Sequence, residues 1–131
     1  MKNLIVITIS IFLIAGCAGS QPQSDDVIVS VDTKKFKELV DSGNGIVLDV
    51  RTPEEVKEGY IAGAEVIDFY SDDFETKVTQ LPKDKEIYVY CSAGGRSMKA
   101  ARILEKNGYN KVYNLKDGSD NWIDAGYPLV Q

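Results

Sequence analysis

A cysteine followed by two glycines and an arginine is the part of this sequence best suited to chemistry. In "YVYCSAGGRSMKAARILEKNG", Cys91 ends an apolar run, Gly94 and Gly95 follow, and Arg96 leads into a helical pattern. Glycines allow a tight turn with positive φ, and successive N–H groups in such a turn can form a nest for an anion. The start of the helix and Arg96 add positive potential. This setting should lower the pKa of the Cys91 thiol and favour the nucleophilic thiolate.

The composition excludes several other kinds of site. The 131 residues contain no histidine and only two cysteines, Cys17 and Cys91. A Ser-His-Asp triad, a Cys-His dyad and a histidine-based metal site are therefore impossible, and a cysteine-based zinc site is disfavoured. The formal net charge of −5 disfavours nucleic acid as a partner, because phosphate binding needs a basic surface. The alternative for Cys91 itself is a buried structural cysteine before a glycine turn.

Short apolar runs alternate with helical patterns from Val27 onward, and these elements must position the cysteine. Strands are predicted over residues 27–31, 45–50, 64–69, 86–91 and 111–115. Helical segments are predicted over residues 32–43, 72–80, 97–108 and 120–125, and a further helix is predicted to start at residues 52–55. Nearly continuous apolar strands that alternate with helices are typical of the α/β class. We therefore predict a five-stranded, mostly parallel sheet with helices on both faces.

Polar or reactive residues stand at the ends of two predicted strands. Asp49 lies at the end of the run 45–50, and Cys91 at the end of the run 86–91. Sites in parallel sheets lie at the carboxyl ends of the strands, so both residues should reach the same edge. Asp49 and Arg51 are expected near the site, where an ion pair that fixes the loop and a direct substrate contact remain equally open. The segment "TPEE" predicts a capping box with Thr52 as N-cap and Glu55 at the third helical position.

The N-terminal residues predict export. Lys2 precedes a mostly apolar stretch over residues 4–15, which is too short to span a bilayer but fits the core of a secretory signal. The following "IAGC" resembles the lipobox of bacterial lipoproteins. This resemblance implies that residues 1–16 form a signal peptide and that Cys17 becomes the lipid-bearing first residue. An ordinary signal peptide or a membrane anchor that contains a cysteine is the alternative.

The segment after the lipobox is expected to be a tether. "AGSQPQSDD" is small, polar and contains proline, so residues 17–26 should link the lipidated cysteine to a folded domain over residues 27–131. The protein is then expected to be exported and lipid-anchored on the extracytoplasmic side of a bacterial membrane. An acylated Cys17 leaves Cys91 as the only free thiol, with no partner for an internal disulfide.

Three motifs of the predicted domain resemble one known family. "CSAGGRS" (91–97) resembles the active-site loop of rhodanese-domain sulfurtransferases, which has the pattern Cys-x-x-Gly-x-Arg-Ser. "VLDVRTPEEVKEGYIAGA" (47–64) is similar to the family's Asp-x-Arg segment and the stretch that follows it. "NLKDGSDNWIDAGYPL" (114–129) is similar to its C-terminal Gly-Gly, Trp and Gly-x-Pro stretch. The motifs occur in the family's order, so the resemblance implies a rhodanese-like fold.

The resemblance also implies an activity. Cys91 would attack the sulfane sulfur of a small donor such as thiosulfate or polysulfide and become a persulfide. The outer sulfur would then pass to a thiol, cyanide or protein acceptor, with no cofactor or metal and in a monomer. Backbone N–H groups of the loop would stabilise the sulfur anion. Substrate binding is thus assigned to Ser92, Ala93, Gly94, Gly95, Arg96 and Arg51, and a supporting role to Asp49 and Ser97.

Two positions depart from the family pattern. Tyr60 stands where the family usually has histidine, and Asp117 stands where the first of two glycines is usual. We expect the change at Tyr60 to be nearly neutral, since that histidine is not the nucleophile. Aspartate tolerates a left-handed backbone better than most residues. We expect Asp117 to reshape a loop near the pocket mouth and alter the choice of substrate.

Three other functions remain as alternatives. The spacing from Cys91 to Arg96 is Cys-x4-Arg. Cysteine phosphatases and the phosphatase branch of the resembled fold use Cys-x5-Arg, a wider loop suited to phosphate, so phosphatase or arsenate reductase activity is disfavoured. A sulfur carrier or interaction module could keep the fold without turnover. A redox role for Cys91 would need an external resolving partner.

Overall fold

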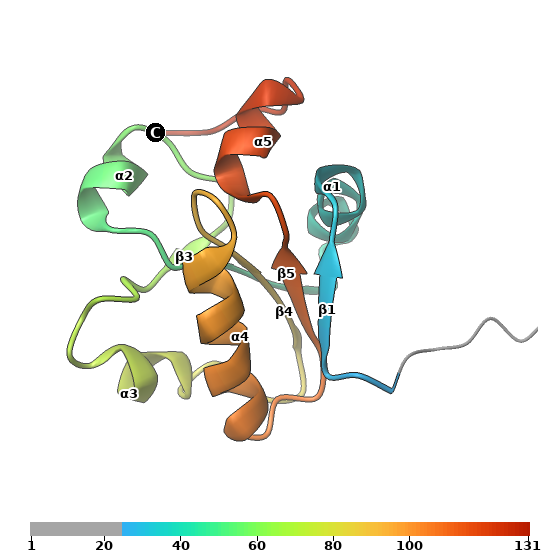
Figure 1. The fold of residues 1–131 in the computed structure, drawn as a ribbon, viewed down its shortest axis with the longest axis vertical. Helices are drawn as coiled ribbons and strands as arrows, with labels where there is room; N and C mark the ends of the chain where they lie inside the picture. Colours follow the sequence, from blue (N-terminus) through green and yellow to red (C-terminus); the bar gives the residue numbers. More distant parts are fainter. Residues whose placement is uncertain (1–24) are drawn as a thin grey trace, which may run out of the picture.

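The computed structural model describes residues 25–131, and the predicted signal peptide, Cys17 and most of the predicted tether lie outside them. The strands are β1 (Ile28–Val31), β2 (Gly45–Asp49), β3 (Glu65–Val66), β4 (Glu86–Tyr90) and β5 (Val112–Leu115). The helices are α1 (Thr33–Ser42), α2 (Pro53–Lys57), α3 (Phe74–Val78), α4 (Gly95–Lys106) and α5 (Gly118–Asp124). The elements follow one another in the chain as strand and helix in strict alternation (Figure 1).

The strands form one sheet in the order β1-β5-β4-β2-β3, and every pairing is parallel. This confirms the predicted α/β class and the five-stranded sheet. β4 lies in the middle of the sheet, between β2 and β5. Its residues Ile87, Val89 and Tyr90 are fully buried, which explains the nearly continuous apolar run in the sequence. The loop that follows β4 therefore starts from the buried centre of the sheet.

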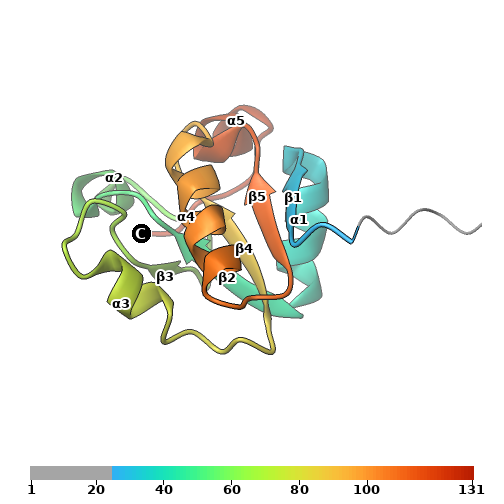
Figure 2. The ribbon, with the colours of Figure 1, turned by 60° about the horizontal axis from the view of Figure 1, so that its bottom comes forward.

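Helices cover both faces of the sheet, as predicted. Figures 1 and 2 show α4 on one face and α1 on the other. On the α4 face, Leu48 and Val89 pack against Ala101 and Leu104. On the opposite face the core contains the side chains of Phe36, Tyr88, Tyr90 and Trp122. Alternate residues along β4 thus serve two separate cores, because successive side chains of a strand point to opposite faces.

Two elements differ in extent from the sequence prediction. The strand predicted over 64–69 is regular only at β3, although Ile67 N–H still donates to Asp49 O at 2.9 Å. Phe69 N–H donates to Val50 O at 3.2 Å, and the chain turns after it, where Asp68 Oδ1 accepts from Tyr70 N–H at 2.9 Å. The helix predicted to begin at Ser97 begins at Gly95 instead. The loop after Cys91 is therefore shorter than the sequence indicated.

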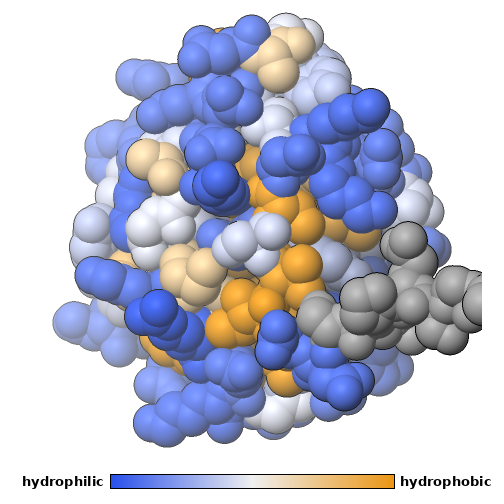
Figure 3. Space-filling view, turned by 45° about the vertical axis from the view of Figure 1, so that its right-hand side comes forward, coloured by the Kyte–Doolittle hydropathy of each residue, from blue (hydrophilic) through white to orange (hydrophobic). Residues whose placement is uncertain are grey.

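The face of the molecule drawn in Figure 3 is mostly hydrophilic. Figure 3 views the side of the molecule on which β1 forms the edge of the sheet, and it shows a band of hydrophobic residues between charged ones. Val27, Ile28 and Val29 are partly exposed at this edge. Within residues 25–131, no helix is long and apolar enough to cross a membrane.

Candidate active site

Cys91 and Asp49 reach the same edge of the sheet, as their positions at strand ends predicted. β2 and β4 are neighbours, and Asp49 is in register with Tyr90, the residue before Cys91. The side chains nevertheless point to opposite faces. Cys91 packs into the core beneath α4, whereas Asp49 accepts a hydrogen bond from Tyr90 OH, on the other face, at 2.7 Å. The strand ends therefore predicted correctly that both residues lie at one edge of the sheet. Because successive side chains of a strand alternate between its faces, Cys91 and Asp49 lie on opposite faces at that edge.

The sulfur of Cys91 lies inside the loop that follows β4. Gly94 N–H donates to Cys91 Sγ at 3.1 Å and Ser97 N–H donates to it at 3.4 Å. The Cys91 thiol donates to Ser97 Oγ at 3.4 Å, and the Ser97 hydroxyl donates to Gly94 O at 3.1 Å. Only 2% of the Cys91 residue is exposed. The loop therefore encloses one sulfur atom with N–H groups and a hydroxyl, which is a setting that stabilises a negative charge on sulfur.

This setting favours the thiolate of Cys91. Burial by itself raises the pKa of the thiol. Hydrogen bonding with the Ser97 hydroxyl, which can turn from Gly94 O toward a thiolate, and with the N–H groups of Ser97, Gly94 and Ala93 outweighs it, so the pKa lies below its ordinary value. No N–H hydrogen bond from Gly95 or Arg96 to the sulfur occurs in the described structure. The sulfur is thus held by part of the loop to which we assigned substrate binding.

The lowered pKa predicts how Cys91 titrates. A depressed pKa means that the thiolate persists at pH values below the ordinary cysteine pKa of about 8.5. The thiolate's ultraviolet absorption, taken as a difference from Cys91→Ser, should titrate with a midpoint below that value. Ser97→Ala removes the hydroxyl beside Sγ and should raise the midpoint. A wild-type midpoint at or above about 8.5, or an unmoved midpoint in Ser97→Ala, would contradict this account.

The start of α5 gives the loop its shape. Ser119 N–H donates to Cys91 O at 2.8 Å, and Asp120 N–H donates to Ser92 O at 3.1 Å. Two carbonyl groups of the loop are therefore turned outward, toward α5. The N–H groups of the following residues are left free to face the sulfur. The loop and the C-terminal motif of the sequence thus act as one structural unit.

Two residues at this junction, Gly94 and Gly118, have positive φ, a backbone conformation that favours glycine. Gly94 has φ +100 and Gly118 has φ +68, while Gly95 is an ordinary first residue of α4. Of the two glycines after Cys91, only Gly94 needs positive φ. Asp117 has φ −102, so the left-handed position belongs to Gly118 and not to Asp117 as the sequence suggested. Asp117 is exposed, and its side chain makes no capping hydrogen bond.

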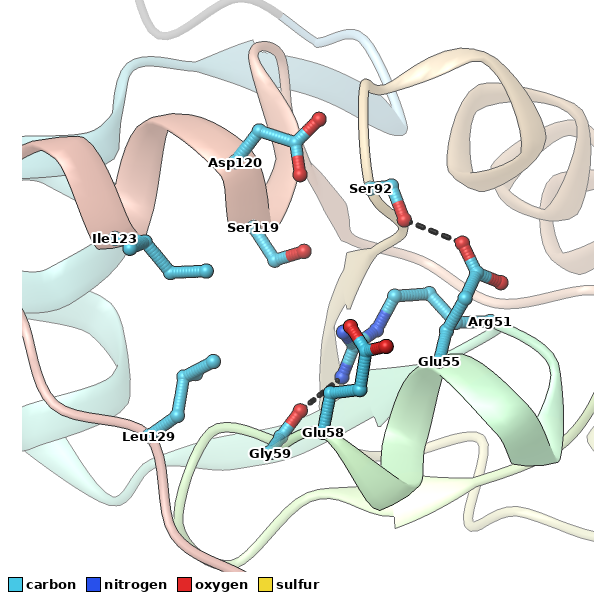
Figure 4. A pocket seen from close by; sticks show the side chains of 9 residues that line it. All are labelled: Arg51, Glu55, Glu58, Gly59, Ser92, Ser119, Asp120, Ile123 and Leu129. Atoms are coloured by element: carbon cyan, nitrogen blue, oxygen red, sulfur yellow. Dashed lines mark hydrogen bonds between the residues drawn. The ribbon is translucent and has the colours of Figure 1, made fainter.

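The Arg96 side chain does not reach the sulfur. Its guanidinium forms a two-point ion pair with Glu55 of α2, at 2.7 Å from Nη1 to Oε2 and 2.8 Å from Nη2 to Oε1. Ser92 Oγ donates to Glu55 Oε1 at 2.6 Å (Figure 4). An arginine engaged in this way is not turned into the loop to hold a phosphate. Like the Cys-x4-Arg spacing, this contact disfavours a phosphatase activity.

Glu55 is the site residue that the sequence interpretation missed. It was predicted only as part of a capping box, and that box is present, with Thr52 N–H donating to Glu55 Oε2 at 2.9 Å. The same carboxylate also binds Ser92 and Arg96. Hydrogen bonds from Arg96 hold the pKa of Glu55 far below its usual range, despite partial burial. The acidic residue at the third helical position was the available signal, and its distant partners were not visible in the sequence.

Glu55→Gln should loosen the cysteine loop. Glutamine keeps the shape of the side chain but loses the charge that pairs with Arg96, and hydrogen bonds to charged groups are the stronger ones. We expect a loss of about 1–2 kcal/mol in the free energy of unfolding, measured with chemical denaturant. Glu54→Gln is the control, because it removes the neighbouring charge in the same helical turn. The Glu54 side chain makes no hydrogen bond to any described side chain. Equal stabilities of the two variants would contradict a special role for Glu55.

Asp49 and Arg51 form a buried ion pair. Arg51 Nη2 donates to Asp49 Oδ2 at 2.7 Å and to Gly59 O at 2.7 Å, and Arg51 Nε donates to Asp49 Oδ1 at 3.0 Å. Asp49 is fully buried and only 5% of Arg51 is exposed. The ion pair, which is one of the two roles that the sequence left open, is therefore present. Arg51 Nη1 makes no hydrogen bond within the described residues, so a substrate contact by Arg51 stays a prediction.

A cavity of about 420 Å³ opens beside the cysteine loop (Figure 4). Its lining comes from α2 and the residues around it, from α5 and from the C-terminal segment. The lining residues are Arg51, Glu55, Glu58, Gly59, Ser92, Ser119, Asp120, Ile123 and Leu129. Cys91 is not among them, although its neighbour Ser92 is. The cavity therefore flanks the loop on the side away from α4.

Tyr60 has a structural role. Tyr60, at the position of the family's histidine, pairs its backbone with Val130 through N–H to O distances of 2.9 and 2.8 Å. This bridge fixes the C-terminal segment beside the cavity.

Within residues 25–131, no group of three or more side chains of the usual metal-binding kinds is placed to hold a metal ion.

Comparisons with known proteins agree with this geometry. The model of the rhodanese-like domain family matches residues 32–125. A sulfurtransferase from Allochromatium vinosum is 30% identical over 105 residues, which cover 79% of this chain and 96% of that protein. Thiosulfate sulfurtransferase 18 of Arabidopsis thaliana is 34% identical over 115 residues, covering 78% of this chain and 83% of its own.

A solved structure gives the same result. The crystal structure of a rhodanese-related protein from Thermoplasma volcanium superposes with a TM-score of 0.68 at 34% identity, covering 77% of this chain and 96% of that one. The family match spans β2 to β5, the cysteine loop and α5. The chain therefore belongs to the rhodanese-like domain family, whose members include proteins named as sulfurtransferases.

Proposed function

We propose that this protein is a sulfurtransferase that moves a sulfane sulfur from a small donor to a thiophilic acceptor through a persulfide on Cys91. The observation that carries the proposal is the enclosure of Cys91 Sγ by the N–H groups of Gly94 and Ser97. A pKa below the ordinary cysteine value supplies the thiolate that such a reaction needs. The family membership supports sulfur transfer as the type of reaction.

In the first step, the Cys91 thiolate attacks the outer sulfur of the donor. With thiosulfate, a new S–S bond forms to Cys91 while the S–S bond of the donor breaks, and sulfite leaves with the bonding electron pair. The product is a persulfide anion on Cys91. In the second step, a nucleophile such as cyanide attacks the outer sulfur, the persulfide bond breaks, and Cys91 returns as thiolate while thiocyanate leaves. Sulfur and electrons balance over the two steps, and no oxidant is consumed.

The proposal is tested by incubating the purified protein with thiosulfate and cyanide and measuring thiocyanate. Parallel lines in double-reciprocal plots are expected, because a covalent intermediate separates the two substrates. Polysulfide as donor and a small thiol as acceptor widen the test. The absence of Cys91-dependent sulfur transfer from any sulfane donor would overturn the proposal.

Burial of the sulfur favours a second candidate function, a sulfur carrier. Only 2% of Cys91 is exposed, and an enclosed persulfide is protected from solvent. A carrier would accept one sulfur and hold it until a specific partner arrives. Intact-mass measurement over time distinguishes the two. A mass increase of one sulfur atom that persists in the presence of cyanide or small thiols favours the carrier, and its loss on the timescale of turnover favours the enzyme.

We further propose that the protein is exported and anchored through a lipid on Cys17. The support is the apolar stretch before "IAGC", which lies outside the described residues. In a bacterial host, labelled fatty acid should be incorporated into the wild-type protein, which should be found in the membrane fraction. Cys17→Ser should lose both properties. Equal labelling of the variant, or no label on the wild type, would overturn this proposal.

A further inference from the structure

We propose that the cavity beside the cysteine loop binds a basic side chain of an acceptor protein, close to the thiol that receives the sulfur. We call this cavity the side pocket, and its lining is that given above. The inference deepens the proposed sulfur transfer and rests on it. It names the acceptor by its chemistry, as a protein segment that carries lysine or arginine near its accepting cysteine.

The charges around the side pocket favour a cation. Of its four charged residues, Arg51 is neutralised by Asp49 and Glu55 by Arg96. Glu58 and Asp120 remain, and neither forms an ion pair within the described part of the chain. Figure 4 shows Glu58, the residue that follows α2, and Asp120 of α5, so the uncompensated carboxylates come from different segments around the cavity. The side pocket therefore carries net negative charge, which attracts ammonium or guanidinium groups and repels small anions.

Other lining groups suit a segment of polypeptide. Arg51 is almost completely buried, yet its Nη1 has no hydrogen-bond partner among the described residues and can donate to a main-chain carbonyl of a ligand. Ile123 and Leu129 lie opposite Arg51 and Glu55 across the cavity, and Ile123 is 53% exposed. An exposed apolar wall next to carboxylates matches a long basic side chain, whose methylene stem is apolar and whose head is charged. Converging polar groups beside an apolar wall are typical of binding sites.

The position of the side pocket explains why it fits an acceptor rather than a donor. Ser92 lines the side pocket and directly follows Cys91, so the two Cα atoms are about 3.8 Å apart. An extended peptide advances by about 3.3–3.6 Å per residue. A basic residue one to three positions from a cysteine can therefore enter the side pocket while the thiol approaches the loop. A small anionic donor gains from the N–H groups around Cys91 and gains nothing from this acidic cavity.

Short peptides provide the test. Acetylated and amidated peptides of the form Gly-Arg-Gly-Cys-Gly-Gly, and of the reversed order, are compared with versions in which glutamine or glutamate replaces arginine. The rate of sulfur transfer from the Cys91 persulfide to each peptide is followed by mass spectrometry. In at least one order, we expect transfer to the arginine peptide to be about tenfold faster than to the glutamate peptide, as two exposed charge contacts imply. The preference should shrink at high salt, because these contacts are screened.

Variants assign the preference to the side pocket. Glu58→Gln with Asp120→Asn should reduce the preference to about twofold or less. Glu105→Gln with Asp84→Asn removes the same charge at the other end of the sheet, near the end of α4 and before β4, and should leave the preference unchanged. Equal rates for the three peptides, or an equal loss of preference in both double variants, would overturn the inference.

A binding measurement separates this inference from the proposed function. Peptides with serine in place of cysteine cannot accept sulfur, so their affinity, measured by calorimetry, reports on the side pocket alone. The serine-containing arginine peptide should bind more tightly than the glutamate peptide and should lose this advantage in Glu58→Gln with Asp120→Asn. Failure of Cys91 to transfer sulfur even to cyanide would overturn the proposed function. Successful transfer to cyanide without any charge preference in binding or transfer would overturn the side-pocket inference only.

Discussion

Alanine at position 94 is expected to disrupt both the fold of the cysteine loop and its chemistry. Gly94 has φ +100, and a Cβ atom there would overlap the main-chain oxygen of Lys116, which is backbone and cannot simply rotate away. Positive φ costs about 1–2 kcal/mol for a residue with a Cβ, and overpacking costs about 1–3 kcal/mol more. We therefore expect Gly94→Ala to lower the free energy of unfolding by about 2–5 kcal/mol. Chemical denaturation measures this loss.

The loss of activity in Gly94→Ala should also be large. The N–H of Gly94 is a donor to Cys91 Sγ, so a displaced backbone removes a hydrogen bond from the thiolate. Displacements of about 1 Å at reacting groups cost about a hundredfold in rate, and we expect a loss of that order in sulfur transfer. Gly118→Ala should behave similarly, because its Cβ would overlap the carbonyl group of Ser92 from the other side of the junction.

The adjacent glycine is a matched control. Gly95 has an ordinary backbone, and a Cβ there meets no atom within 4 Å. Gly95→Ala should leave stability unchanged or raise it slightly, since alanine restricts the unfolded chain. It also keeps the backbone N–H. Comparable effects of alanine at positions 94 and 95 would show that the junction between the cysteine loop and α5 is not as rigid as we infer.

Cys91→Ser should abolish sulfur transfer. A serine hydroxyl is not ionised near neutral pH, and no second thiol exists within the described part of the chain to replace Cys91. We expect thiocyanate formation from thiosulfate and cyanide to fall at least about a thousandfold, the scale on which loss of a catalytic nucleophile acts. The free energy of unfolding should change by less than in Gly94→Ala, because serine is close in size to cysteine.

Ser97→Ala separates the nucleophile from its surroundings. The hydroxyl of Ser97 lies 3.4 Å from Sγ, but the Ser97 N–H is retained in this variant. We expect reduced transfer that recovers at higher pH, where more thiolate forms. Cys91→Ser should show no such recovery. Substantial turnover by Cys91→Ser at any pH would mean that another group carries the sulfur.

The fold and the location of Cys91 could be predicted from the sequence. Nearly continuous apolar strands in alternation with helices predicted the parallel sheet, and the end of the run 86–91 placed Cys91 at its carboxyl edge. The capping box at Thr52 and Glu55 is a local pattern and was also correct. These features follow from residues that are close together in the chain, where spacing fixes geometry.

Contacts between distant segments could not be predicted in this way. Glu55 and Arg96 are far apart in the sequence, and nothing local indicates that they form an ion pair. The hydrogen bonds from the start of α5 to Cys91 and Ser92 are of the same kind. The strand predicted over 64–69 is regular only at β3, and the irregular pairing of Ile67 and Phe69 with the end of β2 is not revealed by an apolar pattern. Which of two glycines takes positive φ likewise depends on the tertiary packing around Gly94.

The central claim is that the loop after β4 holds Cys91 as a thiolate that accepts a single sulfur atom. Its most direct test is the intact mass of the purified protein before and after incubation with thiosulfate, followed by addition of cyanide. The wild type should gain the mass of one sulfur atom and lose it again with cyanide, and Cys91→Ser should show neither change. No gain by the wild type with thiosulfate or polysulfide, or an equal gain by Cys91→Ser, would contradict the claim.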